Sequence, residues 1–90
     1  MKYGINKTPK EVMVLIARNI RAIRKDQKLT QKMLSEKSGV AYATLVKFEK
    51  TGVISFESLL KVCNALDRLK EFESILIPED LIRKEALFDF

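Results

Sequence analysis

The chain has 90 residues, of which 47% are hydrophobic and 32% charged, a composition typical of one soluble globular domain. No apolar run approaches the roughly 18 residues of a membrane span, and the run 12–17 is too short for a secretory signal. We therefore expect a cytoplasmic protein. The chain has one cysteine and no histidine, which argues against a disulfide, a zinc site and the commonest general base. With no phosphate loop or nucleophile–base pair either, we expect no enzyme, metal or cofactor.

The net charge of +5 is unevenly distributed along the chain. Residues 1–50 hold twelve Lys/Arg and four Asp/Glu, a net charge of +8, whereas residues 51–90 hold five and eight, a net charge of −3. This asymmetry indicates that the first half faces a polyanion. Charge alone does not separate DNA from RNA or from an acidic protein, and a basic face that is only solvated stays an alternative.

Residues 1–7 are expected to form a flexible arm before a first helix. Thr8 is placed to cap this helix, Pro9 suits its first position, and Glu11 can return a hydrogen bond to the capping residue. The apolar residues that follow recur at helical spacing: Val12, Leu15 or Ile16, Ile20 and Ile23. The pattern predicts a helix that ends at about residue 26 or 27.

Residues 30–50 form the most informative stretch of the sequence. Thr30 can cap a second helix over about residues 31–37, and Gly39 lies where that helix must stop. A third helix is expected over about residues 42–50. The apolar residues of the stretch are Met33, Leu34, Val40, Leu45 and Phe48. Two short helices joined by a tight glycine turn predict a helix-turn-helix, whose second helix can enter the DNA major groove.

The remaining chain reads as two more helical stretches and a tail. Gly52 ends the third helix, and Val53 and Ile54 are expected to form a buried connector. Ser55 can cap a fourth helix over about residues 56–66, with these residues at core spacing: Phe56, Leu59, Leu60, Cys63 and Leu66. A fifth helical stretch is expected over residues 69–75, before Pro78.

Glu79 and Asp80 favour one more helix start. The apolar end, with Phe88 and Phe90, is expected to dock on the domain or on a partner, the alternative being a frayed terminus. No strand-like alternation is present, so the fold class is all-α. The expected divisions are an arm over 1–7, a DNA-binding domain over 8–76 and a C-terminal extension over 77–90.

Several unlike residue types occur at fixed spacing between positions 24 and 49: Arg24, Leu29-Thr30-Gln31, Leu34-Ser35, Ser38-Gly39-Val40, Thr44-Leu45 and Phe48-Glu49. This run resembles the lambda-repressor/Cro-like helix-turn-helix proteins, or XRE family, over about residues 12–67. The resemblance implies a compact five-helix domain and a repressor-like transcriptional regulator. It also implies a homodimer on double-stranded DNA, with two half-sites about one helical turn apart.

The resemblance further implies roles for individual residues. Tyr42, Ala43 and Lys47 are expected to face base edges. Gln31 is expected to bond a phosphate, and Thr44 and Lys50 to contact the DNA backbone, while Lys32 is a further phosphate candidate by its charge. Arg24 and Glu49 match a pair that forms a structural salt bridge between the first and third helices.

Each reading assignment has a plainer alternative. Gln31 lies in the first turn of a helix, where N–H groups favour a phosphate, but it is also an ordinary surface helix former. Lys47 can donate to guanine or to a phosphate, and Tyr42 can be a half-buried surface aromatic. Ala41 replaces the usual polar cap of the third helix. This small reading face predicts limited base specificity or reliance on DNA shape.

Residues 59–80 resemble the end of short antitoxin-like members of the same family, which occur with kinase-like toxins. That resemblance implies an alternative function. The chain would bind and neutralise such a toxin through its C-terminal part and would regulate its own operon.

Overall fold

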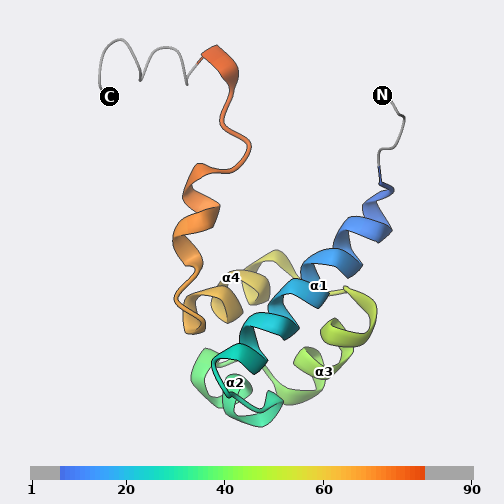
Figure 1. The fold of residues 1–90 in the computed structure, drawn as a ribbon, viewed down its shortest axis with the longest axis vertical. Coiled ribbons are helices and arrows are strands. Elements are labelled where there is room, and N and C mark those ends of the chain that lie inside the picture. Colours follow the sequence, from blue (N-terminus) through green and yellow to red (C-terminus); the bar gives the residue numbers. More distant parts are fainter. Residues whose placement is uncertain (1–6, 81–90) are drawn as a thin grey trace.

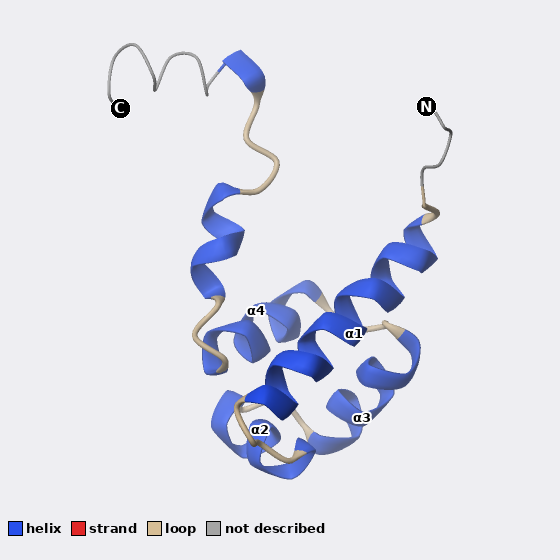
Figure 2. Cartoon of the chain, in the orientation of Figure 1, coloured by secondary structure: helices blue, strands red, loops and turns tan. Residues whose placement is uncertain are grey.

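A computed structural model describes residues 7–80, which form a helical bundle without strands (Figure 2). The elements are α1 (Pro9–Asp26), α2 (Gln31–Ser38), α3 (Tyr42–Thr51), α4 (Phe56–Ala65) and the 3-10 helix η1 (Leu69–Ser74). The predicted all-α, five-helix class is confirmed. Within residues 7–80, none of the helices has the length and apolarity that crossing a membrane requires. The predictions for residues 1–6 and for Phe88 and Phe90 fall outside the described residues.

The start of α1 is fixed by the predicted capping box. The Glu11 N–H donates to Thr8 Oγ1 at 3.1 Å, and the Thr8 N–H donates to Glu11 Oε1 at 2.8 Å. The bond from the Thr8 backbone N–H, followed by an interaction with the Thr8 side chain, lowers the pKa of the Glu11 carboxyl below its usual value. The helix ends where Lys28 takes a left-handed backbone with φ of 62°. The start of the first helix therefore follows from its local sequence, whereas its end takes a left-handed conformation that lysine does not favour.

A single hydrophobic core joins the helices. Its buried members are Ala17, Ile20, Leu34, Val40, Leu45, Phe48, Val62, Cys63, Ala65 and Leu66. In space α1 packs on α3, α2 packs on both α3 and α4, and η1 follows α4 (Figure 1). Cys63 is a core residue as predicted, and burial, followed by the nearby charge of Glu71, raises the pKa of its thiol. The core fixes α3 from one side only.

Two apolar residues predicted to be buried are exposed instead. Val53 is 42% exposed and Phe56 63%, and Met33, the apolar neighbour of Leu34 in α2, is 45% exposed. Met33 lies about 100° around α2 from the buried Leu34, and Phe56 is the first residue of α4, where the helix has not yet reached the core. The fifth stretch also differs from its prediction, because it is a 3-10 helix that ends at Ser74. The spacing of apolar residues predicted where these segments lie, but it did not predict which side of each segment is covered by another helix.

Gly52 allows the end of α3 to lie directly against α1. It is buried, with φ of 81°, and a Cβ there would lie 2.8 Å from the backbone carbonyl carbon of Met13. The backbone of α3 thus closes directly onto α1, and Val53 beyond it faces solvent. Gly39 at the end of α2 has a similar φ of 78°, but a Cβ added there would have no heavy atom within 4 Å. Of these two glycines, Gly52 alone is required by close approach as well as by backbone angle.

Candidate nucleic-acid interface

The outer face of α3 is presented to solvent because its inner face is held in the core. Leu45 is fully buried and Phe48 is 1% exposed. Ala43, Lys47 and Lys50 follow one another at spacings of four and three, so they form one exposed stripe along the helix. Tyr42, 52% exposed, lies at one edge of this stripe. The half-buried Thr44 lies at the other edge.

The turn between α2 and α3 is held by two serines whose role was not anticipated from the sequence. The Ser35 hydroxyl donates to the Val40 carbonyl oxygen at 2.6 Å. The Val40 N–H donates to Ser38 Oγ at 3.1 Å, and Ser38 Oγ in turn donates to the Ser35 carbonyl oxygen at 3.3 Å. Short polar side chains beside a turn glycine are the signal that could have found them. These bonds fix the angle at which α3 leaves α2.

A buried carboxylate joins the three helices of the motif. Glu49 Oε2 accepts from Arg24 Nε at 2.8 Å, and Glu49 Oε1 accepts from Arg24 Nη2 at 3.0 Å. The Arg24 and Glu49 side chains are only 8% and 3% exposed. Arg24 Nη1 also donates to the Leu29 carbonyl oxygen at 2.8 Å, which ties the loop before α2. The structure therefore brings Arg24 and Glu49 together as a two-bond pair between α1 and α3.

Gln31 takes part in the same network. Its Nε2 donates to Glu49 Oε1 at 3.0 Å, so one amide hydrogen points inward, and the residue is half-buried. Arg21 Nε approaches Glu49 Oε1 at 3.8 Å while its side chain stays 54% exposed. The sequence did not reveal the bond between Gln31 and Glu49. A phosphate contact by Gln31 stays a prediction, since its amide has a second N–H hydrogen to donate.

The first turn of α3 has no side-chain cap. Ala41 occupies the capping position, and no side chain there accepts a hydrogen bond from the helix. The first N–H groups of a helix have no partner within the helix, and they favour an anion. Lys32, in the first turn of α2, and Lys50, in the last turn of α3, are both exposed. Ala41 and Tyr42, at the start of α3, are both exposed to solvent.

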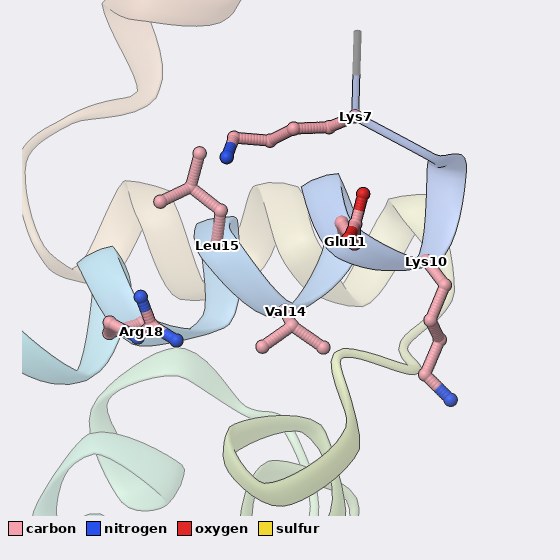
Figure 3. Close-up of a pocket in the computed structure, with 6 residues that line it drawn as sticks. All are labelled: Lys7, Lys10, Glu11, Val14, Leu15 and Arg18. Atoms are coloured by element: carbon pink, nitrogen blue, oxygen red, sulfur yellow. The ribbon is translucent and has the colours of Figure 1, made fainter. Parts of the chain in front are cut away.

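Basic side chains also surround a shallow hollow at the start of α1, and Figure 3 shows its lining. The residues are Lys7, Lys10, Glu11, Val14, Leu15 and Arg18. The Lys7 and Lys10 side chains point away from each other (Figure 3). Glu11 accepts a hydrogen bond from the Thr8 N–H. The hollow is therefore not a site where these cations converge on one ligand. Within residues 7–80, no group of three His, Cys, Asp or Glu side chains could hold a metal ion.

The family comparison agrees with this geometry. The family model described as helix-turn-helix matches residues 20–72, more than half of the chain. The chain belongs to this family. It is a helix-turn-helix protein of the XRE type, a DNA-binding class, and the matched region includes α2, α3, α4 and the buried pair of Arg24 and Glu49. No curated protein matches the chain.

Proposed function

We propose that this helix-turn-helix protein is a sequence-specific transcriptional regulator, repressor-like, that binds operator DNA as a homodimer and has no enzymatic role. The observation that carries the proposal is the exposed stripe of α3, which holds Ala43, Lys47 and Lys50 on a helix whose other side is fixed in the core. A helix held rigidly on one side can insert its solvent-facing stripe into the major groove without breaking its contacts with the rest of the domain. Because operator DNA is the proposed target, the cytoplasm is the proposed location of the protein.

In this proposal Tyr42, Ala43 and Lys47 face the bases. Lys47 donates to guanine O6 or N7, while the Ala43 methyl group packs against a thymine methyl group. The Tyr42 ring, at the edge of the stripe, contacts a thymine methyl group or a sugar. The face offers few donors and acceptors, so part of the sequence preference is expected to arise from DNA shape.

The proposed phosphate contacts come from Gln31, Lys32, Thr44 and Lys50. Gln31 and Lys32 lie in the first turn of α2, where unpaired N–H groups and the helix dipole favour a phosphate. The bond from Gln31 to Glu49 supports this role, because it holds the amide in one orientation and lowers the entropy lost on binding. Thr44 and Lys50 lie on the flanks of α3.

Selection of bound sequences from random DNA tests the proposal. The wild-type protein is expected to enrich a two-fold symmetric site with half-sites about one helical turn apart. Lys47→Ala and Tyr42→Ala are expected to change the preferred bases within each half-site. Lys61→Ala, an exposed lysine on α4, is the matched control and is expected to leave the preference unchanged. Unchanged preferences in both α3 variants would refute their assignment as readers.

An antitoxin-like function is the second candidate. It is supported by the acidic character of residues 71–80, which hold four Asp/Glu and no Lys/Arg, and by the exposed apolar residues that follow η1. In this proposal the C-terminal part would bind a kinase-like toxin while the protein represses its own operon. Co-purification with a kinase-like protein encoded beside it would support this candidate, and its absence from the purified complex would count against it.

A further inference from the structure

The carboxylate of Glu49 gathers donor side chains from α1 and α2 at one point on α3. Glu49 Oε1 accepts from Arg24 Nη2 and from Gln31 Nε2, each at 3.0 Å. Arg21 Nε lies 3.8 Å from the same oxygen. Arg21 of α1 and Gln31 of α2 therefore each hold a side-chain nitrogen within 3.8 Å of a single atom. An anion the size of a phosphate can contact two donors that are held so close to one point.

The two arginines of this cluster differ in how much of their hydrogen-bonding capacity the fold uses. Arg24 donates from Nε, Nη1 and Nη2 to protein atoms, and its side chain is only 8% exposed. Arg21 forms an ion pair with Glu49 that is too long for a hydrogen bond, and its side chain is 54% exposed. Within the described part of the chain, no acceptor takes a hydrogen bond from Arg21. Its five N–H donors are therefore available to a ligand.

The charge of the cluster is also left uncompensated at Arg21. Arg24 and Glu49 neutralise each other inside the domain, where their side chains are 8% and 3% exposed. Arg21 is a second cation beside this already neutral pair. The residues one turn away from it along α1 include no acid: Ala17, Arg18, Arg24 and Lys25. The surface at Arg21 is therefore positive and attracts an anion.

We propose that Arg21 contacts DNA, and that Arg21 and Gln31 bind the same phosphate in each half-site. The inference rests on the proposed function, since it starts from the phosphate contact of Gln31 and adds a cation from α1, which lies outside the helix-turn-helix. Gln31 has a second amide N–H to donate, and a guanidinium presents a planar fork of donors that matches phosphate oxygens. Glu49 sets the spacing of the two donors without touching DNA.

Such a contact positions the domain and does not read bases. Phosphate contacts fix the register and orientation of a protein on the duplex but carry no sequence information directly. Because α1 packs on α3, a phosphate held at Arg21 fixes how the exposed stripe of α3 lies in the groove. Arg21→Gln is therefore expected to select the same bases as the wild type, with a lower affinity for all sequences.

Fluorescence anisotropy with the selected duplex at several salt concentrations tests the contact. Arg21→Gln is expected to weaken binding about tenfold or more, and to make the salt slope shallower by about one for each chain bound. Lys10→Gln is the control, because it removes one exposed positive charge about 16 Å away along α1 and should leave affinity and slope near the wild-type values. Equal effects of the two variants, or an unchanged slope in Arg21→Gln, would overturn the proposal.

Replacing single phosphates of the duplex by uncharged methylphosphonates tests whether the two residues share one phosphate. The wild-type protein is expected to lose affinity at several positions of each half-site. Arg21→Gln and Gln31→Ala are both expected to become insensitive at one and the same position, and to keep their sensitivity elsewhere. Insensitivity at two different positions would overturn the shared contact.

Lys47→Ala separates this inference from the proposal of DNA binding. If Lys47→Ala weakens binding while Arg21→Gln binds as the wild type does, DNA binding stands and the role of Arg21 is wrong. A wild-type protein that binds none of the duplexes would overturn both. Urea denaturation checks that Arg21→Gln is folded, and only a small loss of stability is expected because its ion pair is exposed and long.

Discussion

Two regions of this molecule hold their ion pairs in opposite ways. In the recognition unit, residues 24–51, Arg24 and Glu49 are buried and Glu49 also accepts a bond from Gln31. In the C-terminal part, residues 56–80, the ion pair of Arg68 and Glu71 is exposed, with side chains 45% and 58% accessible. The recognition unit holds seven Lys/Arg and three Asp/Glu, whereas the C-terminal part holds three and six.

The difference gives the two regions surfaces of different character. The recognition unit fixes its helices with internal polar contacts, which leaves the side chains of Ala43, Lys47 and Lys50 exposed on the outer face of α3. The C-terminal part leaves apolar side chains such as Phe56 and Leu76 in water, which favours contact with protein. A small domain gains stability from such association, because it buries a smaller share of its surface alone.

The largest expected effect is on folding and comes from Arg24→Ala. The substitution removes the two-bond partner of the buried Glu49 carboxylate and leaves only the exposed Arg21 as a cation, whose Nε is 3.8 Å away, and such a loss typically costs about 3–5 kcal/mol. Arg68→Ala removes the exposed pair and is expected to cost much less, because solvent screens an exposed ion pair. Urea denaturation of both variants measures the contrast. Similar losses of folding free energy in the two variants would show that the buried pair contributes no more to stability than the exposed pair.

Gly52→Ala is expected to have the next largest effect. The added methyl group meets the Met13 backbone at 2.8 Å, and the positive φ disfavours any L side chain. Backbone strain of about 1–2 kcal/mol adds to overpacking of about 1–3 kcal/mol. Gly39→Ala has the same strain and no close atom, so thermal denaturation should show a smaller loss. Equal losses of stability in the Gly52 and Gly39 variants would mean that α3 can move away from α1 at Gly52 at little energetic cost.

Lys47→Ala is expected to weaken DNA binding and to leave folding nearly unchanged. We expect a loss of about 1–3 kcal/mol in affinity for the selected operator, because a base or phosphate contact is removed. The folding free energy should change by less than about 0.5 kcal/mol, as for most exposed positions. Lys61→Ala on α4 is the control, measured by fluorescence anisotropy with the same duplex. A larger loss from the α4 variant would place the DNA surface in the wrong region.

The smallest expected effect concerns the capping box of α1 and depends on pH. The folded pKa of Glu11 is lowered by its bonds with Thr8, so its contribution is present above the unfolded pKa of about 4.3. That contribution is lost as the pH falls through the lowered folded pKa. Glu11→Ala should therefore be less stable than wild type at pH 7, with a difference that shrinks below about pH 4. A stability difference between Glu11→Ala and the wild type that stays constant with pH would contradict a stabilising bond between Thr8 and the Glu11 carboxylate.

Local chemistry made much of this fold predictable from sequence. Thr8, Thr30 and Ser55 each accept the expected capping bond, and Gly39 and Gly52 each end a helix with positive φ. These signals act over three or four residues, so the sequence alone expresses them. The inward positions of Leu45 and Phe48 followed from helical spacing in the same way.

Contacts between residues that are far apart in the sequence were harder to predict. The bond between Gln31 and Glu49 joins residues 18 apart, and it depends on the angle at which α2 meets α3. The exposure of Phe56 was missed because periodicity marks an apolar stripe without telling which end of it another helix covers. The left-handed Leu76 has no local signal, since its conformation is not one that leucine prefers.

The most direct test of DNA binding by the recognition unit is the salt dependence of affinity for the selected duplex. If the dimer neutralises on the order of 6–10 phosphates, affinity should fall by about 10³–10⁵ between 50 and 200 mM salt. Lys50→Ala should make this slope shallower by about one, because one released counterion is lost. An affinity that barely changes with salt, or a slope that Lys50→Ala leaves untouched, would contradict the assignment of this basic surface to DNA.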